Sequence, residues 1–214
     1  RKMKQKKLIV VITIILLLMM VSSCKKNKEN ESKEDKDMNE KIYAQIEFST
    51  HDVVNLELYP DKAPISVDNF VKLANSDYYK GSIFHRVIAN FMIQIGGYYL
   101  DGNNLCEMPK TSSIQGEFKS NGWDKNDLHH ELGVISMART SDPNSATAQF
   151  FLCAADCDWL DGDYAAFGKT TDEASNQVIL KISRMQTYNI GGGFTDFPVD
   201  PISIVKVSIK NEPF

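Results

Sequence analysis

The sequence lacks several patterns that mark common classes of enzyme. It has no G-x-S-x-G segment, so nothing indicates a nucleophile elbow of the serine-hydrolase type. The three glycines at 191–193 precede no helical pattern, which argues against a phosphate-binding loop. His129 and His130 are adjacent rather than four residues apart, so we predict loop residues and no helical metal site. We therefore expect neither a metal nor another cofactor.

An excess of basic residues is also absent. The 214 residues include 24 Lys and Arg against 28 Asp and Glu, which gives a net charge of −4, and 43% of the residues are hydrophobic. This balance is typical of one globular domain with appendages. Without a basic footprint, a nucleic-acid partner is not expected.

The first 23 residues have the order of a signal peptide. Five basic residues lie within positions 1–7, an uncharged apolar run covers residues 8–21, and small residues end it. The run is short for a membrane-spanning helix, which needs about 20 residues. The "VSSC" at residues 21–24 resembles the lipobox of bacterial lipoproteins. That resemblance implies cleavage before Cys24 and attachment of a diacylglyceryl group to its thiol, with an uncleaved signal anchor as the alternative.

The next segment, residues 24–41, is predicted to be a lipidated cysteine followed by a solvated tether. After Cys24 it contains six lysines and six acidic residues, with Met38 as its only large apolar side chain, and cannot bury enough surface to offset its ordering entropy. A flexible coil of this length reaches on the order of 20–25 Å. Cleavage would remove five positive charges and change the net charge from −4 to −9. We expect a protein anchored by lipid at the extracytoplasmic face of the cell membrane.

Three cysteines remain beyond the tether, and an odd number cannot all pair within one exported chain. Cys153 lies in an apolar stretch and is predicted to be a small buried hydrophobe. A bridge between Cys153 and Cys157 is the alternative, and Cys106 has no assigned partner.

Alternation of apolar and polar residues predicts a mainly β domain over residues 42–214. Period-two patterns at 42–48 and 54–58 predict two half-buried strands, and shorter ones follow at 83–88, 91–95, 133–138, 149–152, 165–169 and 202–209. Helical spacing occurs at 65–74, with Ser66 or Asp68 as the candidate cap, and around 173–183. Strands and helices do not alternate regularly, which favours a closed antiparallel barrel or a sandwich with helices at its ends. Residues 98–126 are predicted to form a long loop.

An arginine lies within the predicted strand at residues 83–88. Strand geometry would place Arg86 on one face with Phe84 and Ile88, and His85 on the other. An arginine among core-directed side chains is costly unless it is paired or lines a cleft. The pattern alone leaves a structural ion pair and a functional group equally open.

Three long segments resemble the cyclophilins, a family of peptidyl-prolyl cis-trans isomerases. The "YYKGSIFHRVIANFMIQIGG" at 78–97 and the "GVISMARTSDPNSATAQFFLCAADCDWLDGDYAAFGK" at 133–169 are similar to two cyclophilin signatures, and "ELYPDKAPISVDNFVKLA" at 57–74 also matches. The resemblance spans roughly residues 42–209. It implies a closed eight-stranded antiparallel barrel capped by two helices, and isomerisation of X-Pro bonds in exported, folding proteins.

The resemblance also implies the site residues. Arg86, Phe91 and Gln94 would be catalytic, with Arg86 acting on the proline and Gln94 bonding the substrate backbone. The pocket for the proline ring would consist of Phe91, Met92, Phe151 and Leu160. The groove for preceding residues would be lined by Ala138, Arg139 and Gln149, with Trp159 and Tyr164 on the far wall. His85 is expected to be structural rather than a base.

Two departures from the family pattern bear on specificity. Many cyclophilins have asparagine where this chain has Arg139 and histidine where it has Tyr164, which predicts altered peptide preference and inhibitor affinity. Ile95 precedes the glycines of the usual "QGGD" pattern, and residues 98–126 replace a glycine-rich loop.

The expected partners are proline-containing polypeptides, cyclosporin-type inhibitors and the membrane, and we expect a monomer. Two other functions remain open: a cyclophilin-fold module that binds proline-containing peptides with little turnover, and a surface interaction protein whose long loop binds a partner or a metal.

Overall fold

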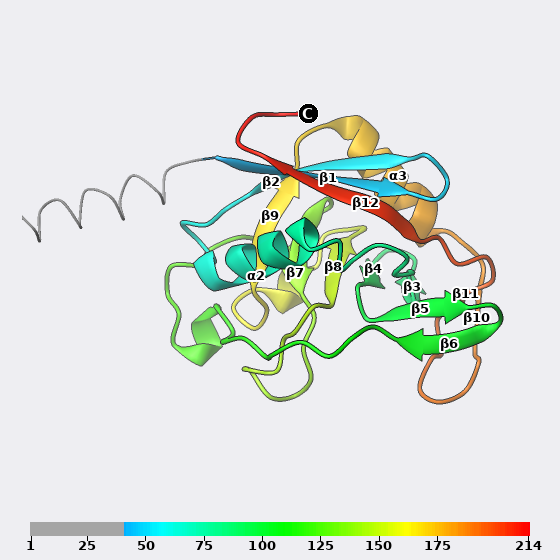
Figure 1. The fold of residues 1–214 in the computed structure, drawn as a ribbon. Helices are drawn as coiled ribbons and strands as arrows, with labels where there is room; N and C mark the ends of the chain where they lie inside the picture. The colour runs from blue at the N-terminus through cyan, green and yellow to red at the C-terminus, as the bar shows by residue number, and fades with distance from the viewer. Residues whose placement is uncertain (1–40) are drawn as a thin grey trace, which may run out of the picture. The chain divides into compact units, whose positions relative to one another are not determined.

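A hairpin begins the part of the chain that the computed structural model describes, residues 41–214 (Figure 1). Its strands are β1 (Ile42–Phe48) and β2 (Val53–Leu58), joined by a turn in which His51 has a φ of 65°. The predicted signal peptide, lipidation site and tether lie outside the described residues, apart from Lys41. The other strands are β3 (Arg86–Ile88), β4 (Met92–Ile95), β5 (Tyr98–Asp101), β6 (Asn104–Glu107), β7 (Val134–Met137), β8 (Phe150–Cys153), β9 (Ala166–Thr170), β10 (Thr187–Tyr188), β11 (Phe197–Pro198) and β12 (Ile204–Lys210).

Eight of these strands form one antiparallel sheet in the order β12-β1-β2-β9-β7-β8-β4-β3. The sheet curls without closing, because within residues 41–214 its edge strands β12 and β3 do not pair with each other. Only residues next to them meet, through the isolated bridge between Ile83 and Ser203 and nearby backbone bonds. The prediction of a closed barrel is therefore wrong, and the fold is an open half-barrel. Ser82 and Ile83, just before β3, each form only one isolated bridge, to Tyr99 and Ser203, so this segment supplies no closing strand.

Helix α2 (Pro64–Asn75) confirms the predicted helix at 65–74. Proline suits the first helical position, where its fixed φ is compatible and no amide is needed. The predicted cap is wrong, because neither Ser66 nor Asp68 caps the helix. The carboxylate of Glu117, from the long loop, instead accepts the backbone amides of Ile65 and Ser66 at 2.8 and 2.7 Å. A buried side chain 51 residues away in sequence thus satisfies the helix N-terminus.

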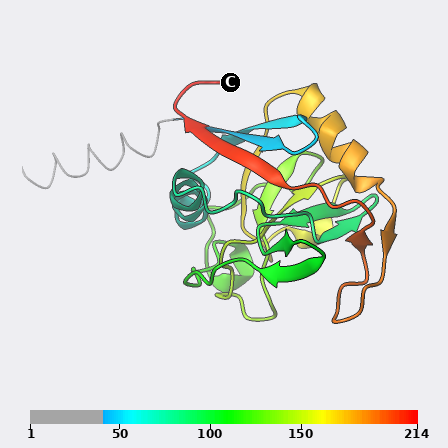
Figure 2. The ribbon, with the colours of Figure 1, turned by 45° about the vertical axis from the view of Figure 1, so that its right-hand side comes forward.

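Helix α3 (Glu173–Ser183) also lies where the sequence predicts it. Asp172 is its N-cap and accepts the amide of Ser175 at 2.7 Å. Figure 2 shows the two helices separated by the strands. Each turns apolar residues toward the same core, including Phe70 of α2 and Ile179 of α3.

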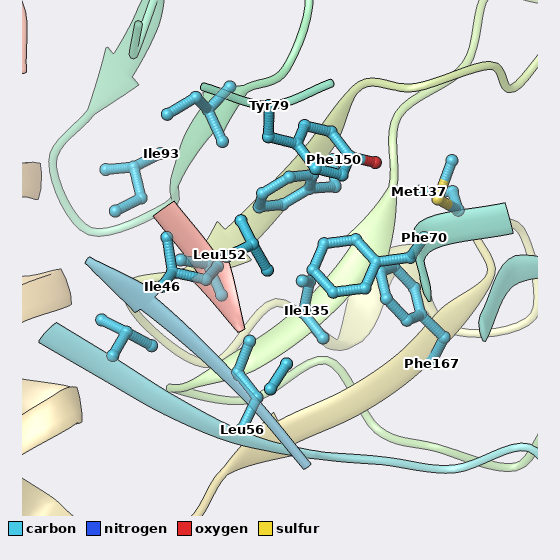
Figure 3. Close-up of a cluster of buried hydrophobic side chains, with 14 of the residues drawn as sticks. Ile46, Leu56, Phe70, Tyr79, Ile93, Ile135, Met137, Phe150, Leu152 and Phe167 are labelled. Carbon is cyan, nitrogen blue, oxygen red and sulfur yellow. The ribbon is translucent and has the colours of Figure 1, made fainter. Parts of the chain in front are cut away.

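The main core fills the concave side of the sheet. In Figure 3, Phe70 lies against Tyr79, Phe150 and Phe167, and the ring centroids are 5.4 to 5.5 Å from that of Phe70. Full burial of a large aromatic or aliphatic side chain contributes roughly 1.5–3 kcal/mol. This core positions the inner faces of β4, β7 and β8, whose outer faces carry the candidate site.

A second, smaller apolar cluster covers the outer face of the same strands. Successive residues alternate between the two clusters: Ile93 and Leu152 belong to the main core, whereas Met92, Phe151 and Cys153 belong to the outer cluster. Cys153 is fully buried, and burial raises the pKa of its thiol, as expected for a small hydrophobe. The three described cysteines are free, so no bridge joins Cys153 to Cys157.

The segment at 98–126 is not only a loop, as the sequence analysis expected. Its first ten residues form a hairpin of β5 and β6, with Tyr99 opposite Cys106. Short, irregularly patterned strands with exposed faces give no clear period-two signal, which explains why they were missed. Among residues 41–214, no helix is long and apolar enough to cross a membrane.

Candidate active site

A row of paired residues crosses the outer face of the sheet. Arg86 of β3 lies opposite Gln94 of β4, Gln94 lies opposite Phe151 of β8, and Phe151 lies opposite Ser136 of β7. Directly paired residues in a ladder project from the same face. Residues up to 65 positions apart in the sequence, from Arg86 to Phe151, are therefore brought into one line.

Arg86 shares the outer face of β3 with Ile88, as the strand pattern predicts, but not with Phe84, which lies in the main core. Regular pairing begins only at Arg86, and both Phe84 and His85 before it are buried. The Arg86 side chain is 45% exposed, with its Nε 3.9 Å from a carboxylate oxygen of Asp196. Its guanidinium carbon lies 5.9 Å from the ring centroid of Phe91. The arginine is thus held at the rim of a cleft, with one loose ion pair and free donors.

A cavity of about 80 Å³ lies between this arginine and the outer apolar cluster. It is small and floored by buried side chains, with Met92 and Phe151 at most 4% exposed. All but two of the predicted site residues line it: Arg86, Phe91, Met92, Gln94, Ala138, Arg139, Phe151, Leu160 and Tyr164.

The two predicted residues that do not line this cavity lie beside it. Gln149 accepts a hydrogen bond from Gln94 Nε2 at 2.8 Å, which orients both amides. Trp159 packs against Phe91 with ring centroids 5.7 Å apart and is 59% exposed, so it forms an outer rim. The structure therefore places all of these predicted residues in or beside one cavity. Their roles stay predictions.

The guanidinium of Arg139 is held by contacts within the protein. It donates two hydrogen bonds to the carbonyl of Asp163, at 3.0 and 2.8 Å, and one to the carbonyl of Thr140 at 2.8 Å. Its guanidinium lies over the ring of Tyr164 at 4.5 Å. These contacts fix the position of the backbone at Asp163 and of the Tyr164 ring, so Arg139 helps to shape the wall of the cavity.

His85 has the properties of a structural histidine, as predicted. It is 4% exposed, and its ring meets those of Tyr98 and Phe194 edge to face at 4.8 and 6.4 Å. Burial lowers the pKa of His85 to about 4, despite nearby hydrogen-bonding groups. A ring that stays neutral and packed at pH 7 is poorly placed to exchange protons with a substrate.

Sequence reasoning missed a buried polar group behind Phe151. His130 has no regular secondary structure, as expected, but its side chain is only 1% exposed and bonded at both ring nitrogens, to Asp161 and Ser136. Adjacent histidines in a polar stretch give no signal that one of them is buried. Among residues 41–214, no three His, Cys, Asp or Glu side chains are placed to hold a metal ion.

Comparison with known proteins identifies the family of this chain. A family model described as "Cyclophilin type peptidyl-prolyl cis-trans isomerase/CLD" matches residues 43–209. The chain belongs to the cyclophilin family. Among similar cyclophilins are a peptidyl-prolyl cis-trans isomerase of Acinetobacter baylyi, 40% identical over 74% of this chain and 80% of that protein, and peptidyl-prolyl cis-trans isomerase A of Dickeya dadantii, 42% identical over 73% and 78%.

A solved cyclophilin from Cryptosporidium parvum has the same fold. Its structure in the presence of the dipeptide Ala-Pro is 25% identical to this cyclophilin, with a TM-score of 0.61 over 78% of this chain and 98% of that one. Together, the family model and the relatives show that this cyclophilin is a peptidyl-prolyl cis-trans isomerase.

The cleft of this cyclophilin suits the isomerisation of a prolyl bond. The barrier of about 18–20 kcal/mol comes from lost amide resonance, so no nucleophile or net proton transfer is needed. An enzyme must bind the twisted amide more tightly than either planar isomer. An apolar cavity can hold the proline ring, while a guanidinium that stays protonated can donate to the pyramidal nitrogen or to a nearby carbonyl.

Proposed function

We propose that this cyclophilin is anchored by lipid at the extracytoplasmic face of the cell membrane, where it isomerises X-Pro bonds in exported proteins as they fold. The order of basic, apolar and small residues before Cys24 supports export and lipidation. The charged stretch after Cys24 supports a spacer between the membrane and the isomerase domain. These segments lie before residue 41, where the described structure begins.

The observation that carries the proposed mechanism is the position of Arg86 beside the apolar cavity. Arg86 would stabilise the twisted amide, and Gln94, oriented by Gln149, would bond the substrate backbone. The ring of the proline would occupy the cavity over Met92 and Phe151. Peptides with an Ala-Pro segment are the substrate class proposed, and a cyclosporin-type inhibitor would compete for the same cavity.

Exchange NMR on a capped Ala-Pro peptide tests the mechanism. The wild-type protein should accelerate cis-trans exchange, and Arg86→Ala should lose most of that acceleration while still folding. Unchanged exchange in Arg86→Ala would reject the role of this arginine. Peptide shift changes without faster exchange in the wild type would instead indicate a proline-peptide-binding module.

Membrane anchoring is tested separately by labelling growing cells with a radioactive fatty acid and separating their membranes. The full chain should take up the label and sediment with membranes. Cys24→Ala should lose both properties, whereas Cys106→Ala, which changes a cysteine of the folded domain, should keep them. Label retained in Cys24→Ala would refute the lipoprotein proposal without affecting the isomerase assignment.

A further inference from the structure

Three side chains behind the proline cavity form a serine–histidine–aspartate chain. His130 Nε2 lies 3.0 Å from Ser136 Oγ, and His130 Nδ1 lies 2.8 Å from an Asp161 carboxylate oxygen. The same oxygen of Asp161 accepts the backbone amide of His130 at 2.8 Å. His130 is therefore held at both ring nitrogens and at its backbone amide.

The partners determine the tautomer of the neutral ring. A carboxylate can only accept, so Nδ1 carries the hydrogen and donates it to Asp161. Nε2 then has a lone pair and accepts the hydroxyl hydrogen of Ser136. Protonation of His130 would reverse the second bond, because Nε2–H must donate and the Ser136 hydrogen must turn away.

This chain cannot perform acyl transfer as it stands. Ser136 is fully buried and His130 is 1% exposed, so no substrate carbonyl can reach the hydroxyl oxygen. A nucleophile needs access to the bond that it attacks. Any effect of Ser136, His130 and Asp161 on the reaction must therefore be transmitted through the side chains that they contact.

The side chain that it supports is Phe151. The His130 ring stacks on the Phe151 ring with centroids 6.1 Å apart and an interplanar angle of 18°, and the Tyr164 ring meets that of Phe151 edge to face at 5.9 Å. Ser136 is also the ladder partner of Phe151. Asp161 follows Leu160, another residue of the cavity wall, directly in the chain. The imidazole thus ties together β7, the ring on β8 and the turn that carries Leu160.

We propose that His130 is a positioning residue for isomerisation: in its neutral form it holds Phe151 and Leu160 in the shape that receives the proline ring, and its protonation in acid loosens that shape. The proposal concerns the isomerase activity of the family and depends on the predicted role of Phe151 in the proline pocket. Substrate is expected to touch Phe151, and His130 acts only through it.

Burial favours the neutral form of His130 at pH 7. Burial, the strongest influence, lowers the pKa of His130, the Asp161 carboxylate opposes this effect, and His129 adds to the lowering. Of the elements packed against the ring, β7 and β8 present the uncharged Ser136 and Phe151. The turn at Cys157 donates a backbone amide to the carbonyl of His130 at 2.6 Å. Activity should therefore be flat near neutrality and fall only in acid.

The test is exchange NMR of a capped Ala-Pro peptide without titratable groups, from pH 7.5 down to pH 5, because no coupling protease is then involved. His130→Phe keeps a stacked ring but removes both hydrogen bonds, and His130→Asn removes the ring. Each should lower kcat/KM at pH 7.5 by about tenfold or less and abolish the acid decline of the wild type.

The chain offers a matched control. The His129 side chain contacts the other carboxylate oxygen of Asp161 at 2.7 Å, but it is exposed to solvent. It does not line the cavity beside Arg86. His129→Ala should keep both the activity and the acid decline. The same decline in every variant, or an equal loss of kcat/KM in His129→Ala, would overturn the proposal.

Ser136→Ala provides a second route if the His130 variants do not fold. The Ser136 hydroxyl pairs with Nε2 in both forms of the ring, and its bond to the charged form is the stronger one. Without it, the pKa of His130 should fall further and the acid decline should move to lower pH. An unmoved decline would count against the proposal. Phe151→Ala tests the role of Phe151 separately from that of His130. Full activity in this variant would overturn both the assignment of Phe151 to the proline pocket and this proposal. Impaired Phe151→Ala with unaltered His130 pH profiles would overturn this proposal alone.

Discussion

Arg86 and Gln94 face each other across the β3–β4 ladder, and Gln94 in turn donates a 2.8 Å hydrogen bond to Gln149. The cavity is therefore lined both by donors, from Arg86 and Gln94, and by the apolar side chains of Met92 and Phe151. A prolyl bond placed between them would have its ring held while its polar atoms meet fixed donors. Preorganised donors of this kind reduce a barrier without having to reorient during the reaction.

Arg86→Ala should lower kcat/KM by about 100- to 1000-fold, the usual effect of removing one preorganised donor. The free energy of unfolding should change little, because the side chain is 45% exposed and its ion pair is long. Arg86→Lys should recover only part of the activity, since lysine lacks the planar fork. Exchange NMR and thermal unfolding measure the two effects. Arg184→Ala, at an exposed position after α3, is the control and should keep full activity.

Gly97→Ala should impair activity more than stability. A Cβ at Gly97 would lie 2.5 Å from side-chain atoms of Gln149, which must then move and release Gln94. We expect a several-fold lower kcat/KM, and a double-mutant cycle with Gln149→Ala should show strong coupling. Additive effects of the two changes would show that Gly97 acts independently of Gln149.

His85 should make the fold less stable in acid. Its pKa is about 4 in the folded protein because of burial, against 6.5 for the ordinary side chain. Between these values the unfolded chain binds the extra proton, so this group's contribution is present at pH 7 and is lost as the pH falls toward 4. The loss amounts to about 3 kcal/mol. Urea unfolding from pH 7 to pH 4 should show a shallower decline in His85→Phe than in the wild type; parallel curves would contradict the assignment.

Glu117→Ala should destabilise the fold by about 2–4 kcal/mol, because it leaves the amides of Ile65 and Ser66 and the Ser66 hydroxyl without their partner. Glu131→Ala is the matched control. Glu131 forms an exposed ion pair with Lys169 at 2.7 Å, and its loss should cost less than about 1 kcal/mol. Chemical unfolding of both variants gives the comparison, and equal losses would mean that Glu117 does not cap α2.

Expectations that depended on local patterns agree with the structure. Both helices and the strands of the main sheet lie at or within a few residues of their predicted positions, because apolar periodicity reports which side of an element is buried. The strand at 83–88 was overextended, since only Arg86–Ile88 pair regularly. The error mattered for Phe84, which lies in the main core and not on the face of Arg86, because the irregular residues before β3 do not alternate.

By itself, the sequence determined the family, the mainly β architecture and most of the residues that line the cavity beside Arg86, because long ordered motifs and apolar periodicity specify them. Only the tertiary structure decided that the sheet stays open, that Glu117 caps α2, and that His130 is buried behind Phe151 while His129 is exposed. These depend on contacts between residues far apart in the chain. Two adjacent histidines are equivalent in sequence, and only the packing of β8 and the turn at Asp161 against one of them makes them different.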